Sequence, residues 1–308
     1  MAMVGPIDRT DVPPGRVVEL SRRGRTYIRE LPGPPGAPVL LLLHGLGATG
    51  GLNWAGAFRL LGEHFRVIAI DHRGHGRGIR TSRFRLEDCA DDVAALMELL
   101  GIETGIHVGY SMGGPIAAML WRRHPGRTRG LVLMATSRNF AGRPADRLWF
   151  AAMGLATAVR MPAPPAVSAV RSMFGRMPLF GPMLGPSFWV LEELCRHDPQ
   201  SLLQAAVAVG RFSCHDWAGD IDVPVAVVAT TLDRIVPLSR QVRLARSIPT
   251  AVLHPVDNGH LAVGPMCGRA TIEAMVDACS QVAHRADGGR FRPAANAGPK
   301  PELRQRPA

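Results

Sequence analysis

Short apolar segments recur along the chain, and longer segments with helical spacing of apolar residues lie between most of them. Each short segment has five or six residues and is rich in Val, Ile and Leu, with few polar positions. Strands that are apolar on both faces and alternate with helices are typical of a parallel sheet covered by helices on both sides. The predicted strands are residues 39–43, 66–70, 105–109, 130–135, 225–230 and 251–256. The sequence therefore predicts an α/β fold with a mostly parallel sheet.

Two flanking patterns extend this prediction. Residues 16–31 alternate between apolar and polar positions around Arg23 and Gly24, which favours an antiparallel hairpin ahead of the parallel strands. Residues 86–101 have helical spacing and carry acidic side chains in the first turns, where the helix dipole favours negative charge. We therefore expect a two-stranded entry to the sheet and a long helix packed on one of its faces.

The alternation of strands and helices is interrupted once, between residues 137 and 216. This segment holds six of the ten Phe and five of the thirteen Met, together with Pro- and Gly-rich stretches. We expect it to form a helical cap over the carboxyl edge of the sheet, although ordinary core helices would give a similar pattern. The expected organisation is a flexible N-terminus (1–15), a first core part (16–136), a helical cap (137–216), a second core part (217–284) and a disordered tail (285–308).

Charge and cysteine usage narrow the functional classes. The formal net charge is +11, but the 35 Arg are scattered outside the tail, and no basic helix or aromatic-basic module is visible, so we expect no nucleic-acid partner. The five cysteines are widely spaced and form no C-x-x-C pair. The N-terminus lacks the apolar core of a signal peptide, and no run approaches the roughly 18 apolar residues of a membrane span. We therefore expect a cytoplasmic protein without a membrane segment.

A serine lies on a glycine-rich turn between a predicted strand and a predicted helix. Residues 109–113 read Gly-Tyr-Ser-Met-Gly, and the helical spacing that follows ends at Pro125. This is a G-x-S-x-G motif in the strand-turn-helix setting that exposes a nucleophilic serine. A strand that reverses directly into a helix crowds its turn, and glycines two positions to either side remove the Cβ atoms that would not fit. Ser111 is therefore the candidate nucleophile.

A serine hydroxyl becomes a good nucleophile only when a base takes its proton, and a carboxylate orients that base. His260 follows the last predicted strand, and Asp233 follows the strand before it, so both are expected at the sheet edge that carries the serine. Asp257 is an alternative acid, although its closeness in sequence to His260 favours a role in the turn. His197 and His215, in or beside the expected cap, are weaker candidates for the base.

The negative charge that develops on a substrate oxygen needs hydrogen-bond donors already directed at it. One candidate is the Met112 N–H, at the start of the helix, where the dipole also helps. The other is the Leu46 N–H, in the His-Gly-Leu-Gly loop after the first parallel strand. We expect these two amides to form an oxyanion hole, and we expect His44, Gly45 and Tyr110 to contact the substrate.

Five motifs occur together in a characteristic order, namely HGLG, DHRGHGRG, GYSMGG, LDRIVP and DNGHL. In these motifs the chain resembles the α/β-hydrolase superfamily, in its capped branch of esterases and lipase-like enzymes, over residues 16–283. The resemblance implies an eight-stranded, mostly parallel sheet with the cap after the sixth strand, and the order Ser111, Asp233, His260 is the order of that superfamily. It also implies that the DHRGHG segment shapes a turn near the site. His72 and His75 lack a third ligand of suitable spacing, so we expect neither a metal nor a cofactor.

The residue types within the motifs separate the activities of the superfamily. Epoxide hydrolases and haloalkane dehalogenases have aspartate where this chain has Ser111, and C–C bond hydrolases usually have an aromatic residue where Leu261 follows His260. The resemblance therefore favours hydrolysis of a small carboxylic ester through an acyl-enzyme, with a lipophilic acyl or alcohol part. An acyltransferase or a C–C bond hydrolase with the same triad, and a binding protein on the same scaffold, stay as alternatives.

Overall fold

The structure is a computed structural model that describes residues 12–158, 185–261 and 268–288. Residues 1–11 of the expected N-terminal segment, residues 159–184 of the expected cap and residues 289–308 of the expected tail lie outside the described residues.

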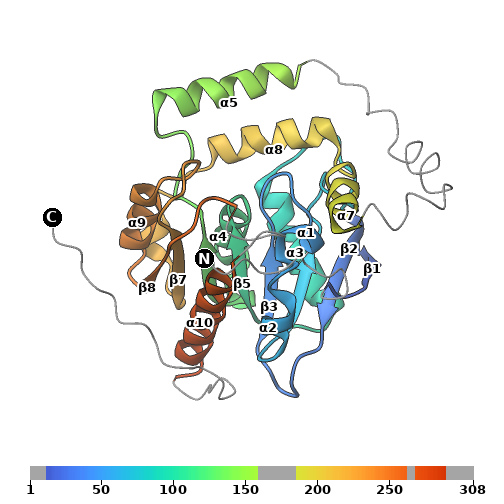
Figure 1. Ribbon diagram of the computed structural model, residues 1–308, viewed down its shortest axis with the longest axis vertical. Coiled ribbons are helices and arrows are strands. Elements are labelled where there is room, and N and C mark those ends of the chain that lie inside the picture. Colours follow the sequence, from blue (N-terminus) through green and yellow to red (C-terminus); the bar gives the residue numbers. More distant parts are fainter. Residues whose placement is uncertain (1–11, 159–184, 262–267, 289–308) are drawn as a thin grey trace.

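Eight strands form one sheet in the order β1-β2-β4-β3-β5-β6-β7-β8 (Figure 1). Neighbours from β4 to β8 in this order pair in parallel, whereas β2 pairs antiparallel with both β1 and β4. The strands are β1 Gly15–Leu20, β2 Gly24–Leu31, β3 Val39–Leu43, β4 Arg66–Ile70, β5 Gly105–Tyr110, β6 Thr128–Met134, β7 Val225–Thr230 and β8 Ala251–Val256. This arrangement confirms the predicted α/β-hydrolase fold, and the observed strand limits lie within two residues of the predicted ones.

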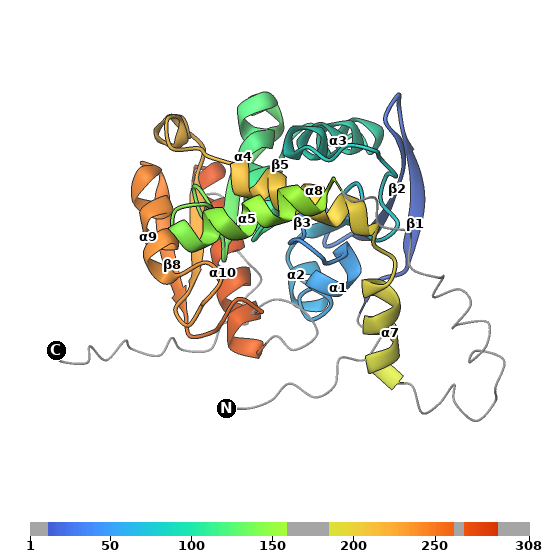
Figure 2. The same cartoon turned by 90° about the horizontal axis from the view of Figure 1, so that it is seen from above.

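Helices cover both faces of the sheet (Figure 2). Side chains of α3, α4 and α9 pack in the apolar cluster on one face, and those of α1, α2 and α10 pack in the cluster on the other. The helices are α1 Gly50–Trp54, α2 Phe58–Gly62, α3 Leu86–Leu99, α4 Gly113–Arg123, α5 Pro144–Ala156, α7 Gly185–Leu194, α8 Pro199–Arg211, α9 Leu238–Ser247 and α10 Arg269–Ala286, with short 3-10 turns at Pro125–Arg127 and Ala218–Asp220.

The continuous apolar run of β3 follows from this double covering. Leu41 and Leu43 belong to the cluster on the α3 side, whereas Leu40 and Leu42 belong to the cluster on the α10 side, and all four side chains are fully buried. Successive side chains of a strand point to opposite faces, so a strand that is covered on both faces needs an apolar residue at every position.

The order of the strands reverses at β3. The chain passes from β3 to β4 on one side and later returns to β5 on the other side of β3. In open α/β sheets, ligands bind outside the carboxyl ends of the strands at the point where the order reverses. The loops after β3 and β5, which hold Leu46 and Ser111, leave the sheet at this point.

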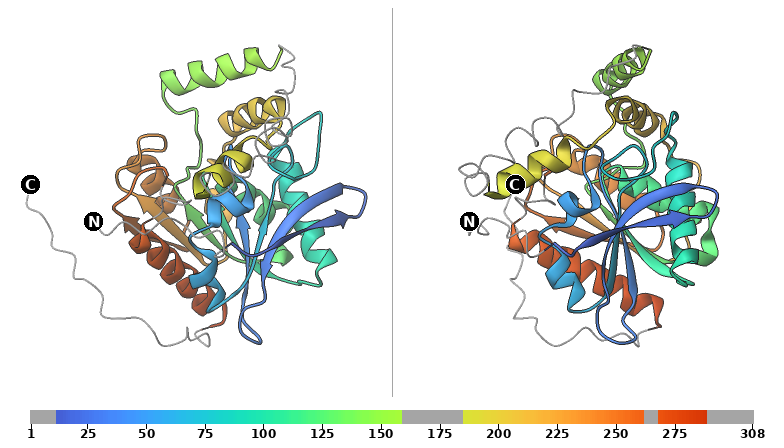
Figure 3. Two further views of the ribbon diagram at one scale, coloured as in Figure 1. Left: turned by 45° about the vertical axis from the view of Figure 1, so that its right-hand side comes forward. Right: turned by 90° about the vertical axis from the view of Figure 1, so that its right-hand side faces the viewer.

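Three described helices of the segment 137–216 lie at the carboxyl edge of the sheet (Figures 1 and 3). Helices α5 and α8 run alongside each other, with Gly210 of α8 against the ring of Phe150 of α5. The Gln200 side chain donates a hydrogen bond to the Thr157 carbonyl oxygen at 2.7 Å. Where α7 leads into α8, the Asp198 N–H donates to the Gly74 carbonyl oxygen in the loop after β4. These contacts hold the helices over the carboxyl ends of the strands.

Two segment boundaries differ from the expected ones. The expected flexible N-terminus included Val12 and Pro13, but Val12 is buried, and the Pro13 carbonyl oxygen accepts a hydrogen bond from Arg29 at 2.6 Å. The expected tail began at Arg285, but α10 continues to Ala286 because Arg285 donates to backbone carbonyl oxygens of β7 and of the turn before β8. None of the helices in the described residues is long and apolar enough to cross a bilayer.

Candidate active site

Ser111 lies on a strained turn between β5 and α4. Its φ is +51°, a conformation that residues other than glycine rarely adopt. The Ser111 N–H donates to Met134 at 2.9 Å, and the Ser111 carbonyl oxygen accepts from the Thr136 hydroxyl at 2.8 Å. A Cβ at Gly113 would lie only 2.0 Å from the Leu43 carbonyl oxygen, so no other residue fits there. Tight backbone packing therefore holds the serine in this conformation.

The structure brings Ser111, His260 and Asp233 into one hydrogen-bonded chain. His260 Nε2 lies 3.0 Å from Ser111 Oγ, although the two residues are 149 positions apart in sequence. His260 Nδ1 lies 2.8 Å from Asp233 Oδ2. The Asp233 carboxylate is fully buried, whereas the imidazole is 12% exposed. This arrangement can transfer the hydroxyl proton of Ser111 to His260 while the carboxylate holds the ring.

Asp233 is held as an ionised carboxylate. Burial alone would raise its pKa, but the hydrogen bond and charge of His260 outweigh burial and, with backbone N–H donors, place the pKa below its ordinary value. The N–H groups of Ile235 and Val236 both donate to Oδ1 at 2.8 Å, and the Thr230 hydroxyl donates to Oδ2 at 2.9 Å. Asp233 therefore stays charged at neutral pH and can stabilise a protonated His260.

The alternative acid and the alternative bases lie elsewhere. Asp257 is exposed, and its Oδ1 accepts a hydrogen bond from the Thr231 hydroxyl at 2.7 Å, which is a turn contact. His215 is exposed in the turn after α8. His197 is buried against the loop after β4, where its Nδ1 accepts from the Gly76 N–H at 3.1 Å.

Sequence reasoning missed a glutamine that supports the acid. Gln241 is fully buried at the start of α9. Its amide donates to the Thr230 hydroxyl at 2.9 Å and to the Val236 carbonyl oxygen at 2.7 Å, and its oxygen accepts from the Thr230 N–H at 3.0 Å. Thr230 and Val236 also donate hydrogen bonds to Asp233, so Gln241 fixes the positions of two donors to this carboxylate. The available signal was a polar residue at a position where the helical spacing puts α9 against the sheet.

The loop after β3 passes close to the serine turn. A Cβ built on Gly45 would lie 3.4 Å from the Ser111 Cβ, so the bare backbone makes this approach possible. Met112 is the N-cap residue of α4, and Gly47 has a φ of +71°. Within the described part of the chain, neither the Leu46 nor the Met112 N–H donates a hydrogen bond to another residue. Their service as oxyanion donors stays a proposal.

His44 forms hydrogen bonds with backbone groups of two loops. Its ring is fully buried, and Nε2 accepts from the His72 N–H at 3.0 Å, so Nδ1 carries the proton and donates to the Gly45 carbonyl oxygen at 2.8 Å. The side chain thus ties the loop after β3 to the loop after β4. Tyr110 is also buried, and the centroid of its ring lies 5.7 Å from that of the His260 ring. The contacts of the His44 ring are thus with backbone groups of two loops, and the substrate contacts expected of His44, Gly45 and Tyr110 stay predictions.

The sequence of this chain is similar to those of known proteins. Residues 38–162 match a family described as alpha/beta hydrolase fold. A putative carbamate hydrolase RutD from Agrobacterium fabrum is 31% identical over 241 residues, which are 74% of this chain and 87% of that protein. The chain belongs to the α/β-hydrolase family. A pimeloyl-[acyl-carrier protein] methyl ester esterase from Chromobacterium violaceum is 32% identical over 222 residues, covering 70% of this hydrolase and 84% of the relative.

A solved structure shares the fold of this chain. A thermophilic esterase from Thermogutta terrifontis superposes on this α/β hydrolase with a TM-score of 0.67, at 23% identity and with 89% of this chain and 99% of that chain covered. The family match and the relative at 31% identity confirm the superfamily resemblance seen in the sequence, and this structure shows that the fold is shared.

Four histidines of this α/β hydrolase form a buried cluster beside the site. The ring of His44 lies 4.4 Å from that of His72 and 5.2 Å from that of His75, which in turn lies 5.4 Å from that of His197. Burial lowers the pKa of His72 and of His75 to about 3 and that of His197 to about 4, and it also lowers the pKa of His44. In the described part of the hydrolase, no group of three or more His, Cys, Asp or Glu residues is placed to hold a metal ion.

We expect this hydrolase to lose stability in mild acid. The four clustered histidines and His107, whose pKa burial lowers to about 3, take up protons below about pH 6.5 in the unfolded chain but stay neutral in the folded one. The unfolded state then binds more protons below about pH 6.5, so the free energy of unfolding falls as the pH falls. The loss is about 1 to 2 kcal/mol between pH 7 and 5 for each histidine whose folded pKa is about 3 or 4. Asp71 offsets part of this loss of stability. Burial raises its pKa to about 6, so the folded state takes up a proton at Asp71 as the pH falls.

Urea unfolding at several pH values between 5 and 7.5 measures this slope. His107→Gln removes one of the five groups and should flatten the slope, whereas His215→Gln, at an exposed position after α8, should leave the slope unchanged. Equal free energies of unfolding at pH 7.5 and pH 5 would show that the five histidines do not act in this way.

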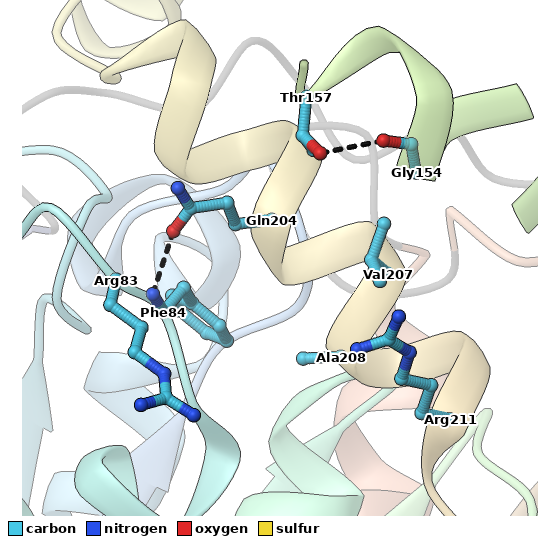
Figure 4. A pocket seen from close by; sticks show the side chains of 8 residues that line it. All are labelled: Arg83, Phe84, Gly154, Thr157, Gln204, Val207, Ala208 and Arg211. Carbon is cyan, nitrogen blue, oxygen red and sulfur yellow. Dashed lines mark hydrogen bonds between the residues drawn. The ribbon is translucent and has the colours of Figure 1, made fainter. Parts of the chain in front are cut away.

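A separate pocket of about 320 Å³ opens between α5, α8 and the turn before α3 (Figure 4). Arg83 and Arg211 line its sides, and the Phe84 N–H donates to the Gln204 side-chain oxygen at 2.7 Å beside it. None of its lining residues belongs to the chain of hydrogen bonds at Ser111. The candidate chemistry of the hydrolase therefore lies at the strand edge and not in this pocket.

Proposed function

We propose that this α/β hydrolase cleaves carboxylic esters through an acyl-enzyme on Ser111. The observation that carries the proposal is the continuous contact from Ser111 Oγ to His260 Nε2 at 3.0 Å and from His260 Nδ1 to the buried Asp233 at 2.8 Å. A non-catalytic binding protein would have no need of a buried carboxylate that orients an imidazole toward a strained serine.

The reaction uses these groups in sequence. His260 Nε2 takes the Ser111 proton as Oγ forms a bond to the acyl carbon, and the carbonyl oxygen becomes an oxyanion that accepts from the Leu46 and Met112 N–H groups. His260 then donates the proton to the alcohol oxygen as the ester C–O bond breaks. Water, activated by His260, attacks the acyl-enzyme, and the acid leaves with Ser111 restored. Asp233 keeps the proton of the neutral imidazole on Nδ1 throughout.

Apolar side chains around these residues support a lipophilic substrate. Four large apolar side chains near the proposed site residues are exposed. Leu232 and Ile235 lie within two residues of Asp233, Leu261 follows His260, and Leu46 is itself a proposed oxyanion donor. Exposed large apolar side chains that gather at a site offer contact to an apolar ligand. The methyl ester esterase among the relatives supports an ester bond as the target.

Carbamate hydrolysis is the second candidate, because a relative at 31% identity is named a putative carbamate hydrolase. A carbamate presents the same kind of carbonyl carbon to the serine, so the same residues would act on it. The difference between the two candidates is in the leaving group and in the acyl part, which a substrate panel separates.

Two measurements on the purified protein test the proposal. A fluorophosphonate should label the native protein at Ser111, as located by mass spectrometry, and heat-denatured protein should stay unlabelled. A panel of p-nitrophenyl esters from acetate to decanoate, with a p-nitrophenyl carbamate and an added alcohol acceptor, should show ester hydrolysis that favours the longer acyl chains. Native protein that is neither labelled nor active on any member of the panel would refute the proposed function.

A further inference from the structure

Helix α7 reaches the loop that carries Leu46. Figures 1 and 3 show α7 beside α1, the short helix that follows this loop. The Thr49 hydroxyl donates a hydrogen bond to Glu193 Oε2 at 2.7 Å, across 144 positions of the sequence. Both side chains are buried, and Glu193 is only 1% exposed. A hydrogen bond from a buried hydroxyl to a carboxylate is short and strong, so this contact fixes the position of Thr49.

The Glu193 carboxylate is itself held from two sides. Its Oε1 accepts from Arg77 Nη1 at 3.1 Å and lies 3.5 Å from Arg196 Nε. Arg77 belongs to the loop after β4, and Arg196 belongs to the turn between α7 and α8. Glu193 therefore joins α7 to the loops after β3 and β4. The charges of Arg77 and Arg196 compensate its buried negative charge.

Core residues hold the remainder of the Leu46 loop. The Gly45 N–H donates to Asn53 at 2.8 Å, and the Gly50 N–H donates to Asp71 at 2.8 Å. Thr49 also accepts the Leu52 N–H at 3.1 Å, as the N-cap of α1. Leu46 lies between the anchor at Gly45 and the anchors at Thr49 and Gly50. The direction of its N–H consequently depends on how both ends of this short loop are fixed.

We propose that Glu193 is a positioning residue, which fixes Thr49 from α7 and thereby orients the Leu46 N–H toward the oxyanion formed on Ser111. The inference rests on the proposed function, because it assigns Glu193 a part in the same reaction. It implies that the oxyanion hole is complete only when α7 is seated on the loop. A donor displaced by a few tenths of an ångström is far less effective at the developing charge, because the stabilisation depends on preorganised geometry.

Isosteric variants test this role. Glu193→Gln removes the charge, and Thr49→Val removes the hydroxyl, whereas Thr49→Ser keeps it. Loss of a whole oxyanion donor lowers kcat by about 10²- to 10³-fold, so we expect both Glu193→Gln and Thr49→Val to lower kcat by about 10- to 100-fold with KM little changed. Thr49→Ser should retain activity. Glu192→Gln, the neighbouring position, removes a carboxylate that pairs with Arg196 and serves as the matched control.

The affinity for a trifluoromethyl ketone separates positioning from simple stabilisation of the fold. The ketone forms a tetrahedral adduct with an oxyanion, so its affinity should fall by the same factor as kcat in Glu193→Gln and in Thr49→Val. The double variant should lose no more than the worse single variant, because the two residues act through one contact. All measurements are made below the melting temperature of each variant.

The outcomes are distinguishable. Full kcat and unchanged ketone affinity in folded Glu193→Gln and Thr49→Val, with wild-type enzyme active and labelled, would overturn the positioning role and leave the proposed function intact. Additive losses in the double variant would also overturn it. A wild-type protein without activity or labelling would remove the proposed function, and this inference would be rejected with it.

Discussion

Replacement of Ser111 by alanine is expected to lower kcat for p-nitrophenyl esters by about 10⁴- to 10⁶-fold. In enzymes with this triad, loss of the nucleophile costs about 10⁶-fold in kcat and leaves a residual rate from the oxyanion hole and substrate binding. The alanine variant keeps His260 and Asp233 in place, but it has no oxygen to form the acyl-enzyme. Initial rates on the preferred ester of the panel, with the fold checked by circular dichroism, measure the loss.

Ser213→Ala is the control for this experiment. Ser213 is an exposed serine in the segment after α8, and its substitution should leave the rate at the wild-type value. A Ser111→Ala variant that turns over at the normal rate would show that another group attacks the substrate, and the geometry at Ser111 would need a different interpretation.

Replacement of Asp233 by asparagine should lower kcat by about 10⁴-fold. The amide keeps the shape of the side chain but can present an N–H to His260 Nδ1, which favours the tautomer with its proton on Nε2. That tautomer cannot take the proton of Ser111, and the positive imidazole loses its buried counter-charge. Steady-state kinetics with the same ester, at the pH of highest activity, measure this effect.

The exposed Asp257 provides a matched comparison. It stands 24 positions after Asp233, its carboxylate contacts Thr231, and Asp257→Asn is expected to change the rate by less than about 10-fold. A larger loss in Asp257→Asn than in Asp233→Asn would reassign the acid to Asp257.

The sheet could be predicted because its strands carry the signal locally. The run from Leu40 to Leu43 is apolar at every position, since both faces are covered, and the limits of β3 match the predicted ones. Ser111 could be singled out in the same way, because the glycines that its tight turn needs stand two positions to either side of it. Both features depend on neighbours in sequence, which a pattern records. Asp233 and His260 could be expected beside Ser111, because each follows a strand that ends at the same sheet edge.

The buried contacts that hold the surrounding loops could not be predicted, because no motif links their partners, which are distant in sequence. His44 looked like a residue facing the substrate, but its ring meets the backbone of His72 from another loop. Glu193 stands beside Glu192 in a helix, where acidic side chains usually face solvent, yet it is buried against Thr49. The sequence does not reveal whether a carboxylate or an imidazole will be buried, because it does not show which distant hydroxyl or amide will form a hydrogen bond with it.

The position of β7 and β8 at the far edge of the sheet has a consequence for synthesis of the chain. Ser111, Leu46 and Met112 belong to the part that leaves the ribosome first, whereas Asp233 and His260 follow the last two strands. A chain synthesised only as far as β6 contains the serine motif but neither Asp233 nor His260. Under the proposed mechanism, Ser111 therefore has no base in a nascent chain until the last two strands and the loops after them have been made.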